Sequence, residues 1–198
     1  TLVAFSSIME ELGSPASDFQ LPNTNPNAGP DVVSLGDFSV MPALLVAFVC
    51  NHCPHVIHIR YCFSDFARSY ADRGLGIVAI SANDISTHPG DGPQKMAAEA
   101  LAHNFSHPYL YDESQETAKA YRAACTPDFF LYDSQRELVY RGQFDASRPN
   151  NDVPVDGSAL RSAVDAVLSD QPVTTDQVPS LGCNIKWKSG QEPDYFST

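Results

Sequence analysis

The hydrophobic residues of this chain fall into short blocks, and the spacing within each block predicts the element that it forms. Residues 43–50 (ALLVAFVC) are apolar on both faces, as in a central strand that is covered on both sides. After Pro54, apolar side chains recur at three- and four-residue steps as far as about residue 72, which predicts a helix. Residues 75–80 form a second apolar block. A strand, a helix and a strand with short connections predict a right-handed parallel crossover.

The remaining segments continue this alternation of strands and helices. They predict short strands near 19–21 and 32–35 around a loop at 21–30, a helix at 93–103, a strand at 108–111, a helix at 113–124, strands at 128–132 and 138–141 in a hairpin, and a helix at 158–168. Residues 170–198 are polar and are expected to wrap the surface as a tail. We therefore expect one α/β domain over 1–198, with a central mixed sheet flanked by helices, an N-terminal hairpin extension and this surface tail.

The charge and the cysteine content narrow the possible partners and location. Acidic residues outnumber basic ones by 24 to 12, and the net charge of -12, without a Lys or Arg run, predicts no nucleic-acid partner. No apolar stretch is long enough to span a bilayer and the first basic residue is Arg60, so we expect no membrane partner and no secretory signal. The five cysteines, an odd number, lack the spacing of a disulfide-stapled domain, and they predict a reducing, cytoplasmic location.

The pair Cys50 and Cys53 lies where the buried strand passes into the predicted helix. A thiol at a helix start faces unpaired backbone N–H groups and the positive end of the helix dipole, which favour the thiolate. His52 and His55, when protonated, act in the same direction. Because the thiolate is the nucleophile in disulfide exchange, we predict Cys53 as the catalytic residue and Cys50 as its partner sulfur. The alternative is that both are small buried apolar residues.

A second candidate feature is the segment Cys125-Thr126-Pro127, immediately before a predicted strand. A proline that enters a central strand removes a donor from the sheet, so its position needs a reason. A cis Thr126–Pro127 peptide bond would turn the chain sharply beside the helix start, and an ordinary trans turn is the alternative. Asn83, Asp84 and Asp91 follow the second central strand and either shape a substrate groove or form a polar surface loop.

Several longer segments match the motifs of a known family. They are GSPASDFQLP (13–22), CNHCP (50–54), Asn83-Asp84 with Pro89, YDE (111–113), CTPDFF (125–130), YRGQFD (140–145) and GCNIKW (182–187). On these segments the chain resembles the thioredoxin superfamily, specifically its peroxiredoxin-like branch of redoxins, over nearly its whole length. The resemblance implies a thioredoxin fold in which Pro127 is a cis-proline facing the active cysteine.

The resemblance also assigns roles to residues around this cysteine. We expect Thr126 and Pro127 to position the substrate chain, and the candidate positioning residues also include Asn51, His52 and Pro54. The first cysteine of a thioredoxin motif falls on Cys53, whereas the second falls on Val56. The second sulfur of that motif is therefore absent, and Cys50 lies upstream on the strand end.

The motif of peroxidatic cysteines is also incomplete in this chain. Peroxiredoxins carry a Pro, a Thr and the cysteine in one short motif, but counting back from Cys53 places Cys50 at the Thr position and Val46 at the Pro position. Counting from Cys50 instead gives Ala47 and Ala43. We therefore do not expect efficient peroxide reduction, although an exposed thiolate oxidises slowly.

Two further cysteines are candidate resolving thiols. Cys183 lies in the tail, where packing gives it no obvious task, and Trp187 suggests that the tail folds back over the active face; a structural cysteine is the alternative. Cys125 precedes the candidate cis-proline by two residues and is within reach of the same site. Cys62 lies on the helix away from its start and is expected to be inert.

The leading hypothesis is a thiol–disulfide oxidoreductase that acts on protein or small-molecule disulfides and is recycled by a thiol electron donor. The alternatives are a thiol peroxidase or peroxide sensor, and a carrier of copper or zinc. The hypothesis of a metal carrier rests on a group of soft ligands, namely Cys50, His52, Cys53, His55, His58 and Cys62. No second ligand pair accompanies this group, so we predict no bound metal and no cofactor.

Overall fold

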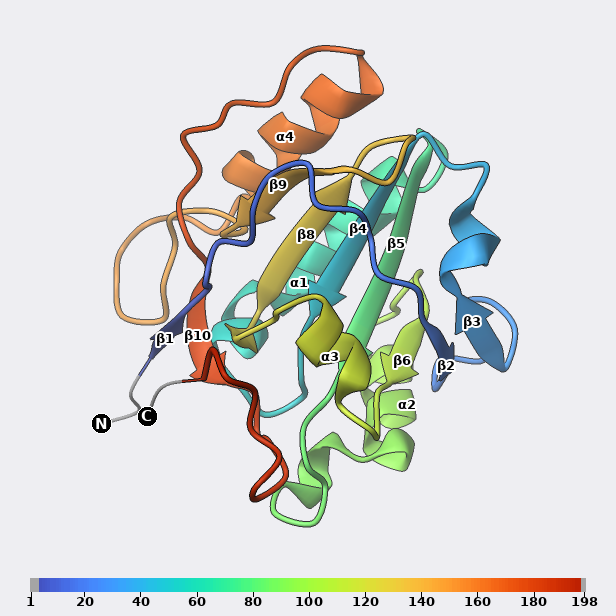
Figure 1. Cartoon of the computed structure of the whole chain (residues 1–198), viewed down its shortest axis with the longest axis vertical. Coiled ribbons are helices and arrows are strands. Elements are labelled where there is room, and N and C mark those ends of the chain that lie inside the picture. The colour runs from blue at the N-terminus through green and yellow to red at the C-terminus, as the bar shows by residue number, and fades with distance from the viewer. Residues whose placement is uncertain (1–3, 197–198) are drawn as a thin grey trace.

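A five-stranded mixed sheet forms the centre of the computed structural model, which describes residues 4–196 (Figure 1). The strand order is β6-β5-β4-β8-β9, with bounds Tyr109–Tyr111 (β6), Leu75–Ser81 (β5), Ala43–Phe48 (β4), Asp128–Tyr132 (β8) and Leu138–Gly142 (β9). β4 pairs with β5 in parallel and with β8 antiparallel, so the sheet is mixed. The predicted α/β class, with helices around a central mixed sheet, is confirmed.

The central strand β4 is buried along its whole length because both of its faces are covered. Side chains alternate between the two faces of a strand, so Leu45 and Ala47 join one apolar cluster, whereas Leu44 and Val46 join the other. This explains why the sequence of β4 is a continuous apolar run rather than an alternating one.

The helices divide between the two apolar clusters. They are α1 (Pro54–Tyr70), α2 (Pro93–Ala102), α3 (Glu116–Ala120) and α4 (Ser158–Leu168), with short 3-10 turns η1 (Leu35–Phe38) and η2 (Pro89–Asp91). α1, α2 and α4 bury apolar side chains in the first cluster, whereas α3 contributes Ala118 to the second. α3 lies over the opposite sheet face from α1 in Figure 1. No helix within residues 4–196 combines the length and the apolar character that crossing a bilayer requires.

The structure corrects one predicted helix and refines the amino-terminal region. α3 is much shorter than the predicted helix at 113–124, because Gln115 and Arg122 adopt positive φ angles of 66° and 52° and interrupt it at both ends. The predicted amino-terminal hairpin is present: β2 (Gln20–Pro22) pairs antiparallel with β3 (Val32–Ser34).

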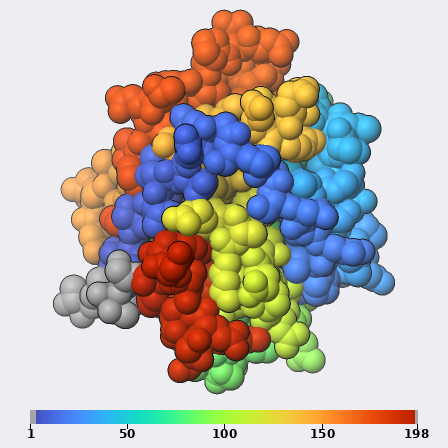
Figure 2. All heavy atoms as spheres, in the orientation of Figure 1, coloured from blue at the N-terminus to red at the C-terminus, as the bar shows by residue number. Residues whose placement is uncertain are grey.

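The carboxyl-terminal tail is more deeply integrated than a surface wrap. Its strand β10 (Leu181–Asn184) pairs with β1 (Phe5–Ser6) on one side and with β7 (Cys125–Thr126) on the other. Cys183, Ile185 and Trp187 are buried, although the sequence around them is polar. Figure 2 shows the tail in red, set into the surface between the blue amino-terminal segment and the yellow-green region of α3.

Candidate active site

Cys53 occupies the N-cap of α1, and Pro54 follows as the first helical residue. Proline suits this position because the N–H that it lacks would have no partner in the first turn. The Cys53 carbonyl accepts the first helical hydrogen bond, from the Ile57 amide at 2.9 Å. The structure therefore has Cys53 at the strand-to-helix junction that the sequence analysis singled out, with its side chain turned inward and 0% exposed.

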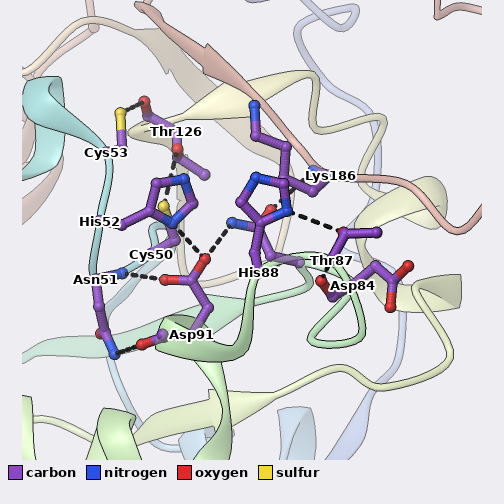
Figure 3. A network of polar contacts seen from close by, with 12 residues as sticks. Cys50, Asn51, His52, Cys53, Asp84, Thr87, His88, Asp91, Thr126 and Lys186 are labelled. Atoms are coloured by element: carbon purple, nitrogen blue, oxygen red, sulfur yellow. Dashed lines mark hydrogen bonds and ion pairs between the residues drawn. The ribbon is translucent and has the colours of Figure 1, made fainter.

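Three cysteines meet at this junction. Cys50, Cys53 and Cys183 form a buried cluster closed by Val56, and all three are free thiols. Thr126 lies against the cluster: its hydroxyl is 3.5 Å from Cys50 Sγ, and its carbonyl oxygen is 3.0 Å from Cys53 Sγ (Figure 3). The cluster thus joins the end of β4, the start of α1, β7 and the tail.

The surroundings of Cys53 stabilise its thiolate. The hydrogen bond from the Cys50 thiol, followed by those from the thiol and amide of Cys183 and the amide of Val56, lowers the pKa of Cys53 to about 4, although burial acts in the opposite direction. The Thr126 carbonyl accepts from the protonated thiol only, so it opposes ionisation, but the donors outnumber it.

The neighbouring thiols of Cys50 and Cys183 have raised pKa values and stay protonated. The hydrogen bond to Cys53, together with burial, raises the pKa of Cys50 well above its ordinary value. Burial, followed by the contact with Cys53, raises the pKa of Cys183 to about 12. The cluster therefore holds one negative charge, on Cys53, with two protonated thiols beside it.

The loop between Cys50 and Cys53 is fixed by a buried carboxylate, Asp91. Its oxygens accept hydrogen bonds from the Asn51 amide and from Asn83 Nδ2, both at 2.8 Å, and from His52 Nδ1–H (Figure 3). The Asp91 hydrogen bond raises the pKa of His52, and although burial raises the pKa of Asp91, the hydrogen bonds from His52 and Asn83 bring it below its ordinary value. The hydrogen bond therefore favours the imidazolium–carboxylate form of this pair beside the cysteines.

Of the five predicted positioning residues, Asn51 and His52 are tied to this network. Asn51 also donates from Nδ2 to the Gly90 carbonyl and accepts from the Tyr109 hydroxyl, at 2.9 and 3.0 Å. The His52 ring stacks on His88, with 5.0 Å between ring centroids. The sequence analysis singled out Asp91 only as a loop carboxylate, because it lies 39 residues from His52 and no local pattern connects them.

Thr126 contacts the thiol cluster through its hydroxyl and its carbonyl, and the peptide bond between Thr126 and Pro127 is cis. Cys125 lies outside the cluster although it adjoins Thr126, because successive residues of a strand point to opposite faces. Its buried thiol is directed to the Pro127 carbonyl, at 3.6 Å. The structure thus brings Cys183 to Cys53 and directs Cys125 elsewhere.

The six soft ligands considered in the sequence analysis do not form one site. His55 and His58 line a separate cleft with Ser147, and His58 Nε2 lies 3.1 Å from the Ser147 hydroxyl. Among residues 4–196 the one group of three or more metal-type ligands whose atoms all lie within 4.8 Å of one another is Cys50, His52 and Asp91. His52 Nδ1 and the Asp91 oxygens are already bonded to each other and to the loop, so a metal ion would have to break this network.

The fold and the site together define the class of protein: a thioredoxin-fold redoxin with a cysteine at the start of the first long helix. The model of the AhpC/TSA family matches residues 12–141. The chain belongs to the AhpC/TSA family. This membership and the fold indicate a redox protein of the thiol–disulfide oxidoreductase or peroxidase kind.

Two solved structures are similar to the whole chain. A hypothetical protein from Sinorhizobium meliloti 1021 is 51% identical, with a TM-score of 0.90, covering 93% of this chain and 99% of that one. An uncharacterized conserved protein from Geobacillus kaustophilus is 45% identical, with a TM-score of 0.92, covering 96% and 98%.

More distant structures share the fold alone. Peroxidoxin BcpB from Mycobacterium tuberculosis is 18% identical, with a TM-score of 0.58, covering 81% of this chain and 97% of that one. A comparison with curated proteins finds no match.

Proposed function

We propose that the protein is a thiol–disulfide oxidoreductase in which the Cys53 thiolate attacks disulfides of a protein or a small molecule. The observation that carries the proposal is the position of Cys53 at the N-cap of α1, among donors that lower its pKa to about 4, with a second thiol in contact. A nucleophile that is ionised near neutrality, next to a protonated thiol, is what two-step exchange requires.

The exchange has two steps. The Cys53 thiolate attacks one sulfur of the substrate, forms a mixed disulfide and expels the other sulfur as a thiolate, which takes a proton from water. Cys50 then loses its proton and attacks the Cys53 sulfur, which releases the second substrate thiolate and leaves a Cys50–Cys53 disulfide. An external thiol donor reduces this disulfide and restores both cysteines. Such a donor fits a reducing compartment, such as the cytoplasm.

Cys50 is our first choice as the resolving thiol. It belongs to the same buried cluster as Cys53, and its thiol makes the largest of the contributions that lower the pKa of Cys53. Cys183 is the second choice, because its thiol and its amide also contact Cys53. Cys125 is the weakest candidate, since its thiol is directed to the Pro127 carbonyl. Thr126 and Pro127 would position the substrate chain opposite Cys53.

Peroxide reduction is the second candidate function, because the chain belongs to a family that also includes peroxidases. Cys50 and Val46 occupy the positions where a peroxidatic motif has Thr and Pro, so that motif is incomplete around Cys53. We therefore expect disulfides to be the better substrates.

The two functions are separated by comparing second-order rates of Cys53 oxidation by a peptide disulfide and by hydrogen peroxide. We expect the disulfide to react at least about tenfold faster, because the Pro and Thr of a peroxidatic motif are absent near Cys53 and a thiolate without them is oxidised slowly by peroxide. Cys62→Ser is the matched control, since Cys62 lies on the same helix away from its start and should leave both rates unchanged. A peroxide rate above the disulfide rate, lost in Cys53→Ser, would establish the peroxidase instead.

A further inference from the structure

The reactive sulfur is closed off in the state described here. Cys53 is 0% exposed, Cys50 is 2% exposed and Cys183 is 5% exposed. A disulfide substrate has to bring its own sulfur against Cys53 Sγ in line with the bond that breaks. No substrate sulfur reaches Cys53 in this arrangement, so exchange requires some covering element to move.

The strand β10 is the covering element that can leave at the least cost. α1 and β4 carry Cys53 and Cys50, but their side chains form the main apolar clusters, so displacing them would unfold the core. β10 contains four residues and lies outside the five-stranded sheet, between two strands of two residues each. Short strands with few buried apolar contacts belong to the parts of a protein that open locally.

The contact between β10 and β7 is unusually close. Cys183 pairs with Thr126 and Asn184 pairs with Cys125 in antiparallel register. A Cβ atom on Gly182 would lie 1.9 Å from the Thr126 carbonyl oxygen, so only glycine permits this approach. The pairing brings the Cys183 thiol and amide onto Cys53, where they contribute to lowering its pKa.

Beyond β10, polar contacts hold the tail to the loop after β5 and to the region of α3. The Asp84 amide donates to the Lys186 carbonyl at 2.8 Å, and the Tyr195 hydroxyl donates to the Ala123 carbonyl at 3.1 Å. Gln115 donates to the Lys186 carbonyl at 2.9 Å and accepts from the Lys188 amide at 2.8 Å, while Asn83 accepts from the Lys186 amide at 2.8 Å. Ile185 and Trp187 add apolar packing against the α3 side of the sheet. These contacts anchor the residues that follow β10. The pairing of β10 with β7 is what covers Cys53.

We propose that β10 is a built-in occupant of the substrate site: it pairs with Thr126 and presents Cys183 to Cys53, and it must leave β7 before an external chain can react. The proposal rests on the proposed function, since it takes Cys53 as the nucleophile. The external substrate is then an extended polypeptide that pairs with the free edge of β7, with its cysteine at the place of Cys183. The residue before that cysteine is glycine, for the reason that holds at Gly182.

The tail competes with this substrate from within the same molecule. A segment tethered by a short connection acts at an effective concentration on the order of millimolar, so an external peptide at micromolar concentration is largely excluded while β10 is intact. Loosening the strand removes the donors of Cys183 from Cys53, but Cys50, the largest contribution, and the Val56 amide still lower its pKa, so the reaction of Cys53 should accelerate.

The test uses a peptide with the sequence of residues 179–187 whose cysteine carries 5-thio-2-nitrobenzoate as a mixed disulfide. Cys53 attacks the peptide sulfur, the nitrobenzoate leaves as a coloured thiolate, and its release is followed optically. Gly182→Ala forces β10 away from Thr126 and should raise the second-order rate at least about tenfold. Gly36→Ala is the matched control: its Cβ would meet nothing closer than Ser34 Oγ at 3.6 Å, so its rate should equal that of the wild type.

A second variant opens the strand by another route, in case Gly182→Ala does not fold. Gln115→Ala removes two hydrogen bonds to the tail main chain without creating a clash, and it should also raise the rate. A folded variant of either kind that reacts no faster than the wild type overturns the proposal. In the opened variant, the peptide with valine in place of its glycine should react more slowly, and equal rates would refute the glycine requirement.

The same assay distinguishes failure of this inference from failure of the proposed function. If Cys53→Ser in the Gly182→Ala background removes the release of nitrobenzoate, Cys53 is the nucleophile and the rate comparison decides the role of β10. If release persists unchanged in that double variant, Cys53 is not the nucleophile and the proposed function fails together with the inference.

Discussion

Cys53→Ser is expected to lower the rate of disulfide exchange by about three orders of magnitude or more, because a serine hydroxyl is not ionised near neutrality and is a poor nucleophile toward sulfur. The substitution is nearly isosteric and leaves the N-cap of α1 occupied by a residue that favours that position. The fold should therefore survive, and the loss should appear in turnover rather than in the yield of folded protein.

The measurement is reduction of a disulfide-bonded protein such as insulin, with a dithiol as electron donor. Cys62→Ser serves as the control, because Cys62 is half-buried on α1 and outside the thiol cluster. Retention of more than about a tenth of the activity in Cys53→Ser would show that another cysteine starts the reaction, since removal of a nucleophile normally costs far more.

Asp91→Ala is expected to lower the free energy of unfolding by about 3 kcal/mol, because it leaves buried polar partners without an acceptor. Asp91 is 0% exposed, and the Asn51 amide, Asn83 Nδ2 and His52 all donate to it. Chemical denaturation at constant pH measures the effect. Asp84→Ala is the control: this carboxylate lies in the same region and is half-buried, but it accepts only from the amide and hydroxyl of the exposed Ser86, so its loss should cost no more than about 1 kcal/mol.

The difference between wild type and Asp91→Ala should depend on pH. Asp91 has its pKa lowered below the ordinary 3.8, so its contribution is complete above that value and disappears as the pH falls through the lowered one. His52 has its pKa raised above 6.5, so the contribution of its charge is present below 6.5 and is lost as the pH rises through the raised value. The destabilisation should therefore be largest between about pH 4 and 6.5. A difference that does not change with pH would show that the pair is not ionised.

The sequence predicted those parts of the fold that local periodicity encodes. β4, α1 and β5 were predicted within a few residues because a continuous apolar run, a helical repeat and a second run follow one another with short joints. α3 was predicted too long, since nothing in the sequence indicates that Gln115 and Arg122 adopt positive φ angles. Local pattern is informative where the element's own apolar residues provide its packing.

The site depends on contacts that are distant in sequence, and there local patterns fail. β10 is polar and short and exists as a strand through its pairing with β1 and β7, so it resembled a surface segment. Asp91 approaches His52 because η2 returns the loop toward the end of β4. Cys125 illustrates the opposite case: it adjoins Thr126 in sequence, but strand alternation directs its thiol to the Pro127 carbonyl.

The most direct test of the account is a titration of thiolate absorbance in the ultraviolet, as the difference between wild type and Cys53→Ser. This equilibrium measurement does not require a reagent to enter the closed site. The account predicts one thiolate that persists from neutral pH down to about pH 4, where it becomes protonated. A thiolate signal that emerges only near the ordinary thiol value of 9.0 would contradict it, because Cys53 would then be an un-ionised, buried thiol at neutral pH.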